Sequence, residues 1–168
     1  MKIELKNVHF SEHLSEETNA FTADVYVNGL KCGYAKNDGQ GGCTYIGAYL
    51  TPDSRSIMDK AENYCLTLPD INIGSETDPF MVKSNMETVV DNLFELWLKK
   101  KDETKMKKFD LTHVRWGVPK GNTYTSVNFK KPINTIPHTV LQGYLNTWKL
   151  TFKTGEVFLN TNLEGFDL

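Results

Sequence analysis

Hydrophobic and polar residues alternate over much of the first fifty positions, which is the pattern of β-strands with one buried face. Ile3 and Leu5 alternate with charged neighbours, and residues 21–27 repeat the alternation until it stops at Asn28-Gly29. Asn-Gly between two alternating runs favours a type I′ turn, because both central residues of that turn need positive φ. We therefore predict a β-hairpin centred on this pair.

A glycine-rich stretch, AKNDGQGGCTY, follows at residues 35–45. Because residues 43–49 again have the composition of a strand, the stretch is most simply a hairpin loop in a three- or four-stranded antiparallel meander. It matches neither GxxxxGK[ST] nor GxGxxG, and it leads into a strand rather than a helix. Successive glycine amides can still form an anion-binding nest. A flexible turn is the leading interpretation, and the alternative is a ligand or partner contact through Lys36, Asn37, Asp38, Gly39, Gly41 and Gly42.

Two helices are predicted next, from apolar residues that recur at helical spacing. The first is expected to begin with Pro52-Asp53-Ser54 as its cap and to stop before Pro69. In the second, Ser84 and Glu87 are expected to form a capping box, and the helix should end near Lys100. The path of residues 69–83 between the helices is left open, apart from a short extended piece at 71–73. The apolar faces are Ile57, Met58, Ala61, Tyr64, Cys65 and Leu68 in the first helix, and Met86, Val89, Val90, Leu93, Phe94 and Trp97 in the second.

Residues 111–118 and 123–130 form a second hairpin candidate around the turn sequence Pro119-Lys-Gly-Asn122. If Val118 pairs with Thr123, Val114, Trp116, Val127 and Phe129 share one face, and His113, Arg115, Tyr124, Ser126 and Asn128 share the other. A titratable base, a fixed cation and hydroxyl groups on one face can recognise a phosphate or exchange protons. The simpler interpretation is the solvent face of an amphipathic hairpin.

A third helix is predicted after Pro137, running to roughly Phe152 with Gly155 as its C′ residue, before a short strand over 157–160. Residues 147–160 also alternate, so a hairpin there is the alternative. The predicted fold is a single compact α+β domain over residues 1–168, an antiparallel N-terminal β-meander followed by two helices, a second β-hairpin and a C-terminal helix. All of the apolar faces are expected to pack into one core.

The net charge of the chain gives no reason to expect binding to nucleic acid or to a membrane surface. The 168 residues carry 19 basic and 21 acidic side chains, a formal net charge of −2, so no global field draws the chain to nucleic acid or to an anionic membrane. The lysine-rich segment 99–108 lacks arginine and aromatic residues and is interpreted as a solvated helix end. Nucleic acid, if bound at all, would be bound through Lys99, Lys100, Lys101, Lys105, Lys107 and Lys108. Glu87, Asp91 and Glu95 recur every four residues and leave a polar face for water or for a partner.

The spacing of the cysteine and histidine residues is not typical of a metal site. Cys32, Cys43 and Cys65 are odd in number and fit no CxxC spacing, which argues against a disulfide framework and for a reducing compartment. Cys65 is expected to pack in the core, whereas Cys43 is the thiol expected to be exposed. His9 and His13 lie four residues apart without a third ligand, so we expect no metal site and no cofactor. The reducing compartment indicated by the cysteines predicts a cytoplasmic protein. No window approaches eighteen apolar residues, so no membrane segment is expected.

Three segments, FTADVYVNG at 21–29, GYAKNDGQGGCT at 33–44 and FLNTNLEG at 158–165, resemble small uncharacterised proteins of tailed phages and mobile elements of gut bacteria. The resemblance implies a phage or mobile-element origin and expression inside a bacterial cell, and it brings no activity, cofactor or catalytic residue with it. The leading hypothesis is a non-enzymatic binding protein that acts on a host protein or host factor, for example against a host defence. Two alternatives are a nucleotide-binding or nucleotide-cleaving protein that uses the glycine-rich loop and the His113 and Arg115 face, and a virion structural or cargo protein.

Overall fold

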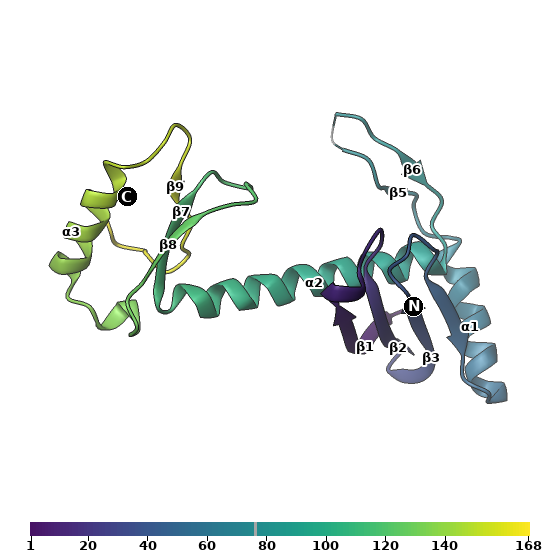
Figure 1. Cartoon of the computed structure of the whole chain (residues 1–168). Helices are drawn as coiled ribbons and strands as arrows, with labels where there is room; N and C mark the ends of the chain where they lie inside the picture. Colours follow the sequence, from purple (N-terminus) through teal and green to yellow (C-terminus); the bar gives the residue numbers. More distant parts are fainter. Residues whose placement is uncertain (76) are drawn as a thin grey trace. The chain divides into compact units, whose positions relative to one another are not determined.

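The computed structural model describes residues 1–75 and 77–168 and confirms the predicted α+β class (Figure 1). The chain divides into two compact units, residues 1–98 and 99–168, and each is described by itself. The first unit contains β1 (Ile3–Ser11), the 3-10 helix η1 (Glu12–Leu14), β2 (Ala20–Val27), β3 (Leu30–Asn37), β4 (Tyr45–Ala48), α1 (Pro52–Cys65), β5 (Ile71–Asn72) and β6 (Met81–Val82). Helix α2 (Met86–Asp110) begins in the first unit and ends in the second, which adds β7 (His113–Gly117), β8 (Thr125–Asn128), the 3-10 helix η2 (Ile133–Thr135), α3 (His138–Lys149) and β9 (Val157–Phe158).

The first unit is built on a four-stranded antiparallel sheet in the order β1-β2-β3-β4. The predicted hairpin at Asn28-Gly29 is confirmed, and φ values of 49° and 84° at the two residues fit a type I′ turn. Strand β1 forms one edge of the sheet and contains a register shift between Lys6 and His9. Strand β4 forms the other edge and is shorter than the predicted strand over 43–49.

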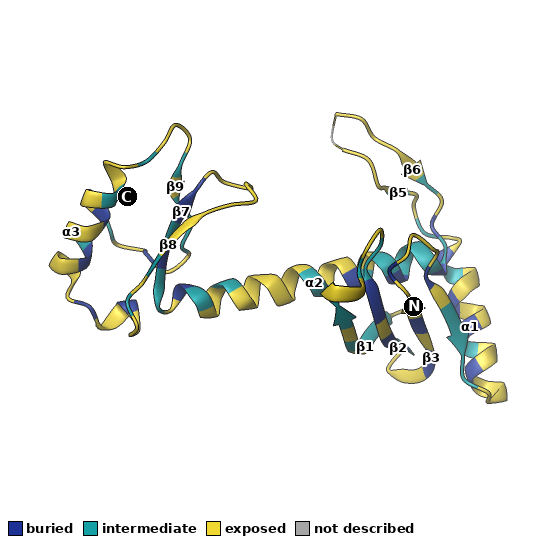
Figure 2. Ribbon diagram, in the orientation of Figure 1, coloured by how far each residue is buried: buried dark blue, intermediate teal, exposed yellow. Residues whose placement is uncertain are grey.

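One face of this sheet is covered by α1 and by the first half of α2. Val25 and Ala35 of the sheet, Ala61 of α1 and Val90 of α2 are fully buried in a common cluster (Figure 2). In the same cluster the ring of Phe94 stacks on the ring of Phe21, with 4.0 Å between centroids. Most members of the two predicted apolar faces pack in this cluster, namely Ile57, Met58, Ala61, Cys65, Met86, Val89, Val90, Phe94 and Trp97. Tyr64, Leu68 and Leu93 were predicted with them but are not part of the cluster.

The start of α2 differs from the prediction by one residue. The Asn85 side chain accepts a hydrogen bond from the Thr88 amide at 2.8 Å, and the Thr88 hydroxyl accepts one from the Asn85 amide at 2.9 Å. The predicted capping box of Ser84 and Glu87 is wrong, because the Ser84 hydroxyl donates to the carbonyl of Pro69 instead. Two neighbouring residues can both cap a helix, and a tertiary contact decides between them.

The segments on either side of α1 refine two further expectations. Helix α1 begins at Pro52, but its cap is Thr51, whose hydroxyl accepts from the Ser54 amide at 3.1 Å. The predicted cap of Pro52-Asp53-Ser54 is therefore one position late. The extended piece expected at 71–73 is present as β5, which pairs antiparallel with β6.

In the second unit, α2 continues to Asp110 rather than ending near Lys100, so segment 99–108 lies within the helix. Strands β8, β7 and β9 then form a three-stranded sheet in that order. Arg115 pairs with Ser126 and Val114 with Val127, which confirms the predicted hairpin register and its two faces.

The C-terminal segment confirms the helix and rejects the hairpin over 147–160. Helix α3 ends at Lys149 rather than at Phe152, and Gly155 is not its C′ residue. With φ at 84°, Gly155 lies in a separate turn, in which the Glu156 amide donates to the Lys153 carbonyl at 3.0 Å. This turn leads into β9, the short strand that pairs with β7.

The second unit has its own core. Buried Val114, Ile133, Leu141, Leu145 and Leu163 form a cluster to which α3 contributes two leucines. The expectation that all apolar faces share one core is therefore wrong for the C-terminal helix. A sequence pattern identifies a buried face but not the surface that covers it. That residues 1–168 form a single compact domain stays a prediction.

The helix cap gives a first test. Replacing Asn85 with alanine removes the acceptor for the Thr88 amide, so we expect the free energy of unfolding to fall by about 1 kcal/mol. Asn92 is an exposed asparagine inside the same helix, and Asn92→Ala is the matched control, expected to be neutral or slightly stabilising. Urea unfolding followed by circular dichroism measures both variants. Equal effects of the two changes would contradict the assignment of Asn85 as the cap.

Candidate functional site

The glycine-rich loop is tied to the segment that follows η1. The Gly39 carbonyl accepts hydrogen bonds from the amides of residues 16–18 at 2.9, 3.0 and 3.3 Å, and the Gly41 amide donates to the Thr18 hydroxyl at 3.3 Å. Gly39 has φ at 86°, and a Cβ atom there would collide with the Leu14 carbonyl. Glycine is thus required at position 39 by both backbone conformation and space. The loop is fixed by its own contacts rather than slack.

Asn37 is the centre of this loop. Its side-chain oxygen accepts from the Thr18 hydroxyl and from the Gly39 amide, both at 2.9 Å. Its side-chain nitrogen donates to the Gly42 carbonyl at 3.0 Å and to the Thr44 hydroxyl oxygen at 3.2 Å. Asn37 is buried, so these bonds satisfy its amide group inside the protein.

The other predicted loop residues lie around a surface cavity. Lys36 and Asp38 form an exposed ion pair at 2.7 Å. The cavity has a volume of about 600 Å³ and is lined by Tyr34, Lys36, Asn37, Asp38, Gln40, Gly42, Cys43 and Tyr45. The Gly39 and Gly41 amides already donate within the protein, which removes two donors from the anion nest considered above. Ligand contact at this loop stays a prediction.

The acidic row on α2 binds loops of its own unit. Thr44 donates from its amide to Glu87 at 2.9 Å and from its hydroxyl to Asp91 at 2.6 Å. Asn19 donates to Glu95 at 2.9 Å. Burial raises the pKa of Asp91, and the neighbouring carboxylates of Glu87 and Glu95 raise this pKa further, against the lowering effect of the Thr44 hydrogen bond. From the sequence we expect this row to face water or a partner. In the structure its carboxylates accept hydrogen bonds from loops of the same unit.

The cysteines are as expected: Cys43 is exposed, and Cys32 and Cys65 are buried. The pKa of the Cys43 thiol is raised, first by its hydrogen bond with Glu87 and then by the charge of that carboxylate. Because the thiolate is the nucleophilic form, this environment makes Cys43 less reactive.

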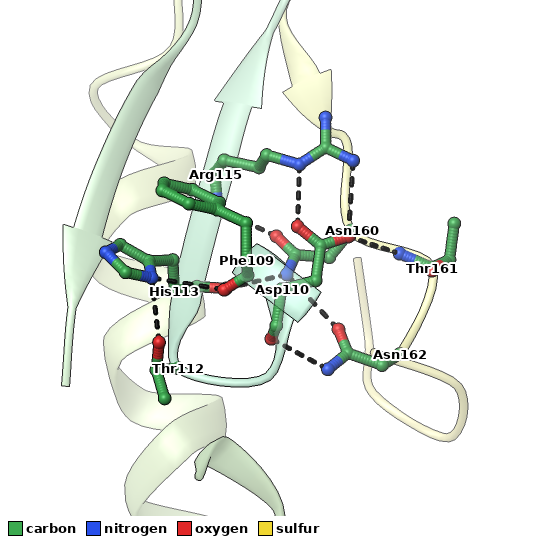
Figure 3. A network of polar contacts seen from close by, with 8 residues as sticks. All are labelled: Phe109, Asp110, Thr112, His113, Arg115, Asn160, Thr161 and Asn162. Atoms are coloured by element: carbon green, nitrogen blue, oxygen red, sulfur yellow. Dashed lines mark hydrogen bonds and ion pairs between the residues drawn. The ribbon is translucent and has the colours of Figure 1, made fainter. Parts of the chain in front are cut away.

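The second predicted site is organised by Asp110 at the end of α2 (Figure 3). The Arg115 guanidinium donates to the Asp110 carboxylate twice, at 2.7 and 3.2 Å. The Asp110 side chain is 1% exposed and that of Arg115 is 13% exposed, so this pair is nearly withdrawn from water. The cation predicted for phosphate recognition is bound to a buried carboxylate and holds β7 to the helix.

The C-terminal segment completes the same network (Figure 3). Asn160 accepts from the Arg115 amide at 2.7 Å and donates to the His113 carbonyl at 2.8 Å, so its side chain continues the β7 ladder. Asn162 donates to the Asp110 carbonyl at 2.8 Å. The segment FLNTNLEG at 158–165 thus serves the fold of this unit. The sequence did not identify Asp110, Asn160 or Asn162, because no local pattern marks them.

His113 is also engaged. Its ring stacks on the ring of Phe109 with 3.8 Å between centroids, and its Nδ1 lies 2.9 Å from the Thr112 hydroxyl and 3.1 Å from the Phe109 carbonyl (Figure 3). The remaining members of the predicted face, Tyr124, Ser126 and Asn128, are exposed. The face exists as predicted, but its base and its cation have structural partners. It belongs to the second unit, whereas the glycine-rich loop belongs to the first.

A larger cleft follows the edge strand β4. Its volume is about 880 Å³, and its walls come from both faces of β4, from one side of α1 and from the start of α2. The lining includes Tyr34, Tyr45, Ile46, Ala48 and Tyr49 of the sheet region, Arg55, Met58, Asp59 and Glu62 of α1, and Met86 and Glu87 of α2. No residue of the two predicted sites lies in this lining. No local pattern in the sequence marks this cleft, because strand order determines which strand becomes an edge.

Three tyrosines stand on the sheet face that the helices leave open. The Tyr34 ring lies 5.8 Å from that of Tyr45 and 6.1 Å from that of Tyr49, measured between centroids. Tyr34 also covers Gly47, where a Cβ atom would meet its ring at 2.8 Å. Tyr49 donates to Asp24 at 2.9 Å, which fixes one end of the group. The cleft is therefore bordered by aromatic rings on this side.

Comparison of the chain with protein-family models, with curated proteins and with solved structures finds no match. Among residues 1–75 and 77–168, no three or more His, Cys, Asp or Glu side chains are arranged to hold a metal ion. No helix in this described part of the chain has the length and hydropathy needed to cross a bilayer. Function is therefore inferred from geometry.

The raised pKa of Asp91 predicts a pH-dependent stability. Because the folded state binds this proton more tightly than the unfolded chain, stability falls as pH rises from about 4, the usual Asp pKa, through the folded pKa. Asp91→Asn keeps an acceptor for Thr44 and removes the charge. We expect it to stabilise the protein at pH 7 by less than about 1 kcal/mol, since the site is partly exposed.

Thermal unfolding from pH 3 to pH 8 tests this expectation. The gain from Asp91→Asn should vanish below about pH 4, where the wild-type carboxyl is protonated in both states. The exposed Asp102 on the same helix supplies the control variant Asp102→Asn, which should not change the profile. A gain that is independent of pH would show that charge is not its cause.

The buried ion pair of the second unit gives another test. Asp110→Ala leaves the Arg115 guanidinium without its carboxylate, so we expect a loss of about 3 kcal/mol in the free energy of unfolding. Asp110→Ala with Arg115→Ala should cost less than the sum of the two single changes, because both remove one interaction. Chemical denaturation of the wild type, the two single variants and the double variant gives the coupling free energy of this double-mutant cycle. Additive effects would contradict the role assigned to the pair.

Proposed function

We propose that the protein is a non-enzymatic binding protein that captures an extended segment of another protein by adding it as a fifth strand beside β4. The observation that carries this proposal is the contrast between the two edges of the first sheet. Edge strands expose backbone hydrogen-bonding groups, and proteins usually protect them by short length, charges, proline, a bulge or a covering element. The two edges of this sheet differ in that protection.

Strand β1 is a protected edge. It carries Glu4 and Lys6 and has a register shift between Lys6 and His9, with Asn7 at a φ of 49°. Such a bulge twists an edge and interrupts its ladder. Strand β4, with the sequence Tyr45-Ile-Gly-Ala48, has no charged residue and no proline, and its pairing with β3 is regular. The edge beside the cleft is thus a short strand of four residues that lacks a charge, a proline and a bulge.

The backbone of β4 points hydrogen-bonding groups into the cleft. Antiparallel pairing alternates between groups that face the neighbouring strand and groups that face away. The Tyr49 amide donates to the Cys32 carbonyl at 3.0 Å, so alternate residues before Tyr49 face β3. Ile46 and Ala48 therefore direct their amide and carbonyl groups outward, in the same row as the Thr44 amide that donates to Glu87. An added strand would bind to this row.

The size of the site also fits a short extended peptide. A strand rises by about 3.3 Å per residue, so a segment matched to β4 spans roughly 13 Å. The cleft volume of about 880 Å³ falls within the range of binding sites that bury much of their ligand. Its floor includes the buried Met58 and Met86, whose flexible thioethers pack against varied side chains.

The cellular setting of this proposal rests on the sequence. The resemblance to phage and mobile-element proteins makes a protein of the bacterial host, in the cytoplasm, the expected partner, and this origin stays a prediction. The nucleotide alternative loses support, because Arg115 is bound to Asp110 and two loop amides are used internally. The virion alternative stays a prediction.

Proline on the edge strand tests the proposal. Ala48→Pro removes an outward amide while leaving the β3 side of the ladder intact, and Ala48→Ser is the control that keeps the amide. We expect Ala48→Pro to weaken capture of the partner from bacterial lysate by about five- to tenfold, because a hydrogen bond is lost and the ring obstructs the edge. Melting temperatures confirm that both variants are folded.

Crosslinking locates the partner. Leu50 is 95% exposed and lies just beyond β4, so a photoreactive residue at this position should crosslink to the captured protein. Equal capture by Ala48→Pro, or no crosslink from position 50 to a protein that is captured, would contradict strand addition. A crosslink to a second copy of the chain would show that the edge serves self-association instead.

A further inference from the structure

We infer that the segment bound beside β4 is basic, with lysine or arginine at alternate positions. This inference rests on the proposed function and adds the chemistry of the partner. It depends on which groups border the cleft on its helix side. One wall is a single stripe of α1, formed by Arg55, Met58, Asp59 and Glu62, which are spaced so that they lie on one side of the helix.

The charged groups around the cleft are unequal in sign. Asp59, Glu62 and Glu87 are acidic, and Arg55 is the basic residue among the lining side chains. Asp59 and Glu62 are exposed, so they are accessible to a partner. Glu87 is half-buried at the end of the cleft, where it accepts from the Thr44 amide. A partner segment that brings positive charge is complementary to this wall, and an acidic segment is repelled by it.

Strand geometry determines where that positive charge lies. Successive side chains of an added strand point to opposite faces of the sheet, so alternate residues face α1. A lysine or arginine there can lay its alkyl stem over Met58 and Met86, which form the apolar floor, and extend its charged end to Asp59 and Glu62. The length of these side chains suits a site with an apolar base and an acidic rim.

The opposite side of the added strand meets the tyrosines. Tyr45 is 60% exposed and Tyr34 is 38% exposed, and their rings border the same cleft. Aromatic faces attract cations as well as apolar groups. The tyrosine side therefore accepts basic or apolar residues, whereas the α1 side selects basic ones.

Two labelled peptides test the inference with the full chain. The basic probe is Thr-Val-Lys-Val-Lys-Val-Thr, and the acidic probe has glutamate in place of each lysine. Fluorescence anisotropy should show that the basic peptide binds roughly tenfold or more tightly than the acidic one, as expected for two ion pairs at an exposed site. The difference should decrease as salt is raised, because exposed charges are screened.

Charge reversal on α1 supplies the decisive variant. Asp59→Lys with Glu62→Lys should abolish or invert the preference for the basic peptide. Asp102→Lys with Glu103→Lys is the matched control, since both residues are exposed on α2 outside the cleft. It should leave the preference unchanged. Equal binding of the two peptides to wild type, or equal effects of the two double variants, would overturn the inference.

A third peptide separates this inference from the proposed function. The basic sequence with an N-methyl group on every backbone amide keeps its charge but has no N–H group on either edge to donate to the sheet. Binding of this peptide with undiminished affinity would contradict strand addition and leave the charge preference standing. Failure of both unmethylated peptides to bind would contradict the proposed function itself.

Discussion

The edge strand β4 depends on Thr44, the residue directly before it. Its amide donates to Glu87 at 2.9 Å and its hydroxyl to Asp91 at 2.6 Å, while Asn37 donates to the same hydroxyl oxygen at 3.2 Å. These bonds join the sheet to the helix that covers its core. The bond to Glu87 also uses the outward amide of Thr44, so the first residue whose outward backbone groups can bind an added strand is Ile46. The cleft is thus built around a strand that is fixed at one end.

A carboxylate of α2 has the same role in each unit. In the first, Asp91 and Glu87 hold the loop before β4, and in the second, Asp110 holds Arg115 of β7. The surroundings of the two carboxylates differ. Burial and the neighbouring carboxylates raise the pKa of Asp91, whereas Asp110 is paired with a guanidinium in a nearly dry site. Residues that resemble a catalytic or phosphate-binding set by composition therefore serve to join helix to sheet.

Local patterns in the sequence were sufficient to predict the helices, strands and turns. They were not sufficient to predict which residues contact one another in the folded protein. The hairpin at Asn28-Gly29 follows from turn chemistry, and the β7–β8 register follows from alternation. The cap of α2 could not be assigned, because Ser84 and Asn85 are both good caps and the carbonyl of Pro69, distant in sequence, binds Ser84. Asp110 was missed for the same reason, since its partners include a residue 52 positions away. The cleft was not predicted because it borders an edge strand, and local patterns do not show which strand lies at the edge of the sheet.

Strand addition requires that β4 bind another strand along Ile46 and Ala48. Amide hydrogen exchange of these two residues, measured in the free protein and with the basic peptide bound, tests it most directly. We expect bound peptide to slow exchange at Ile46 and Ala48 and to leave exchange unchanged at Tyr45 and Gly47, which face β3. Unchanged exchange at Ile46 and Ala48 in a saturated complex, or slowing confined to another part of the chain, would contradict it.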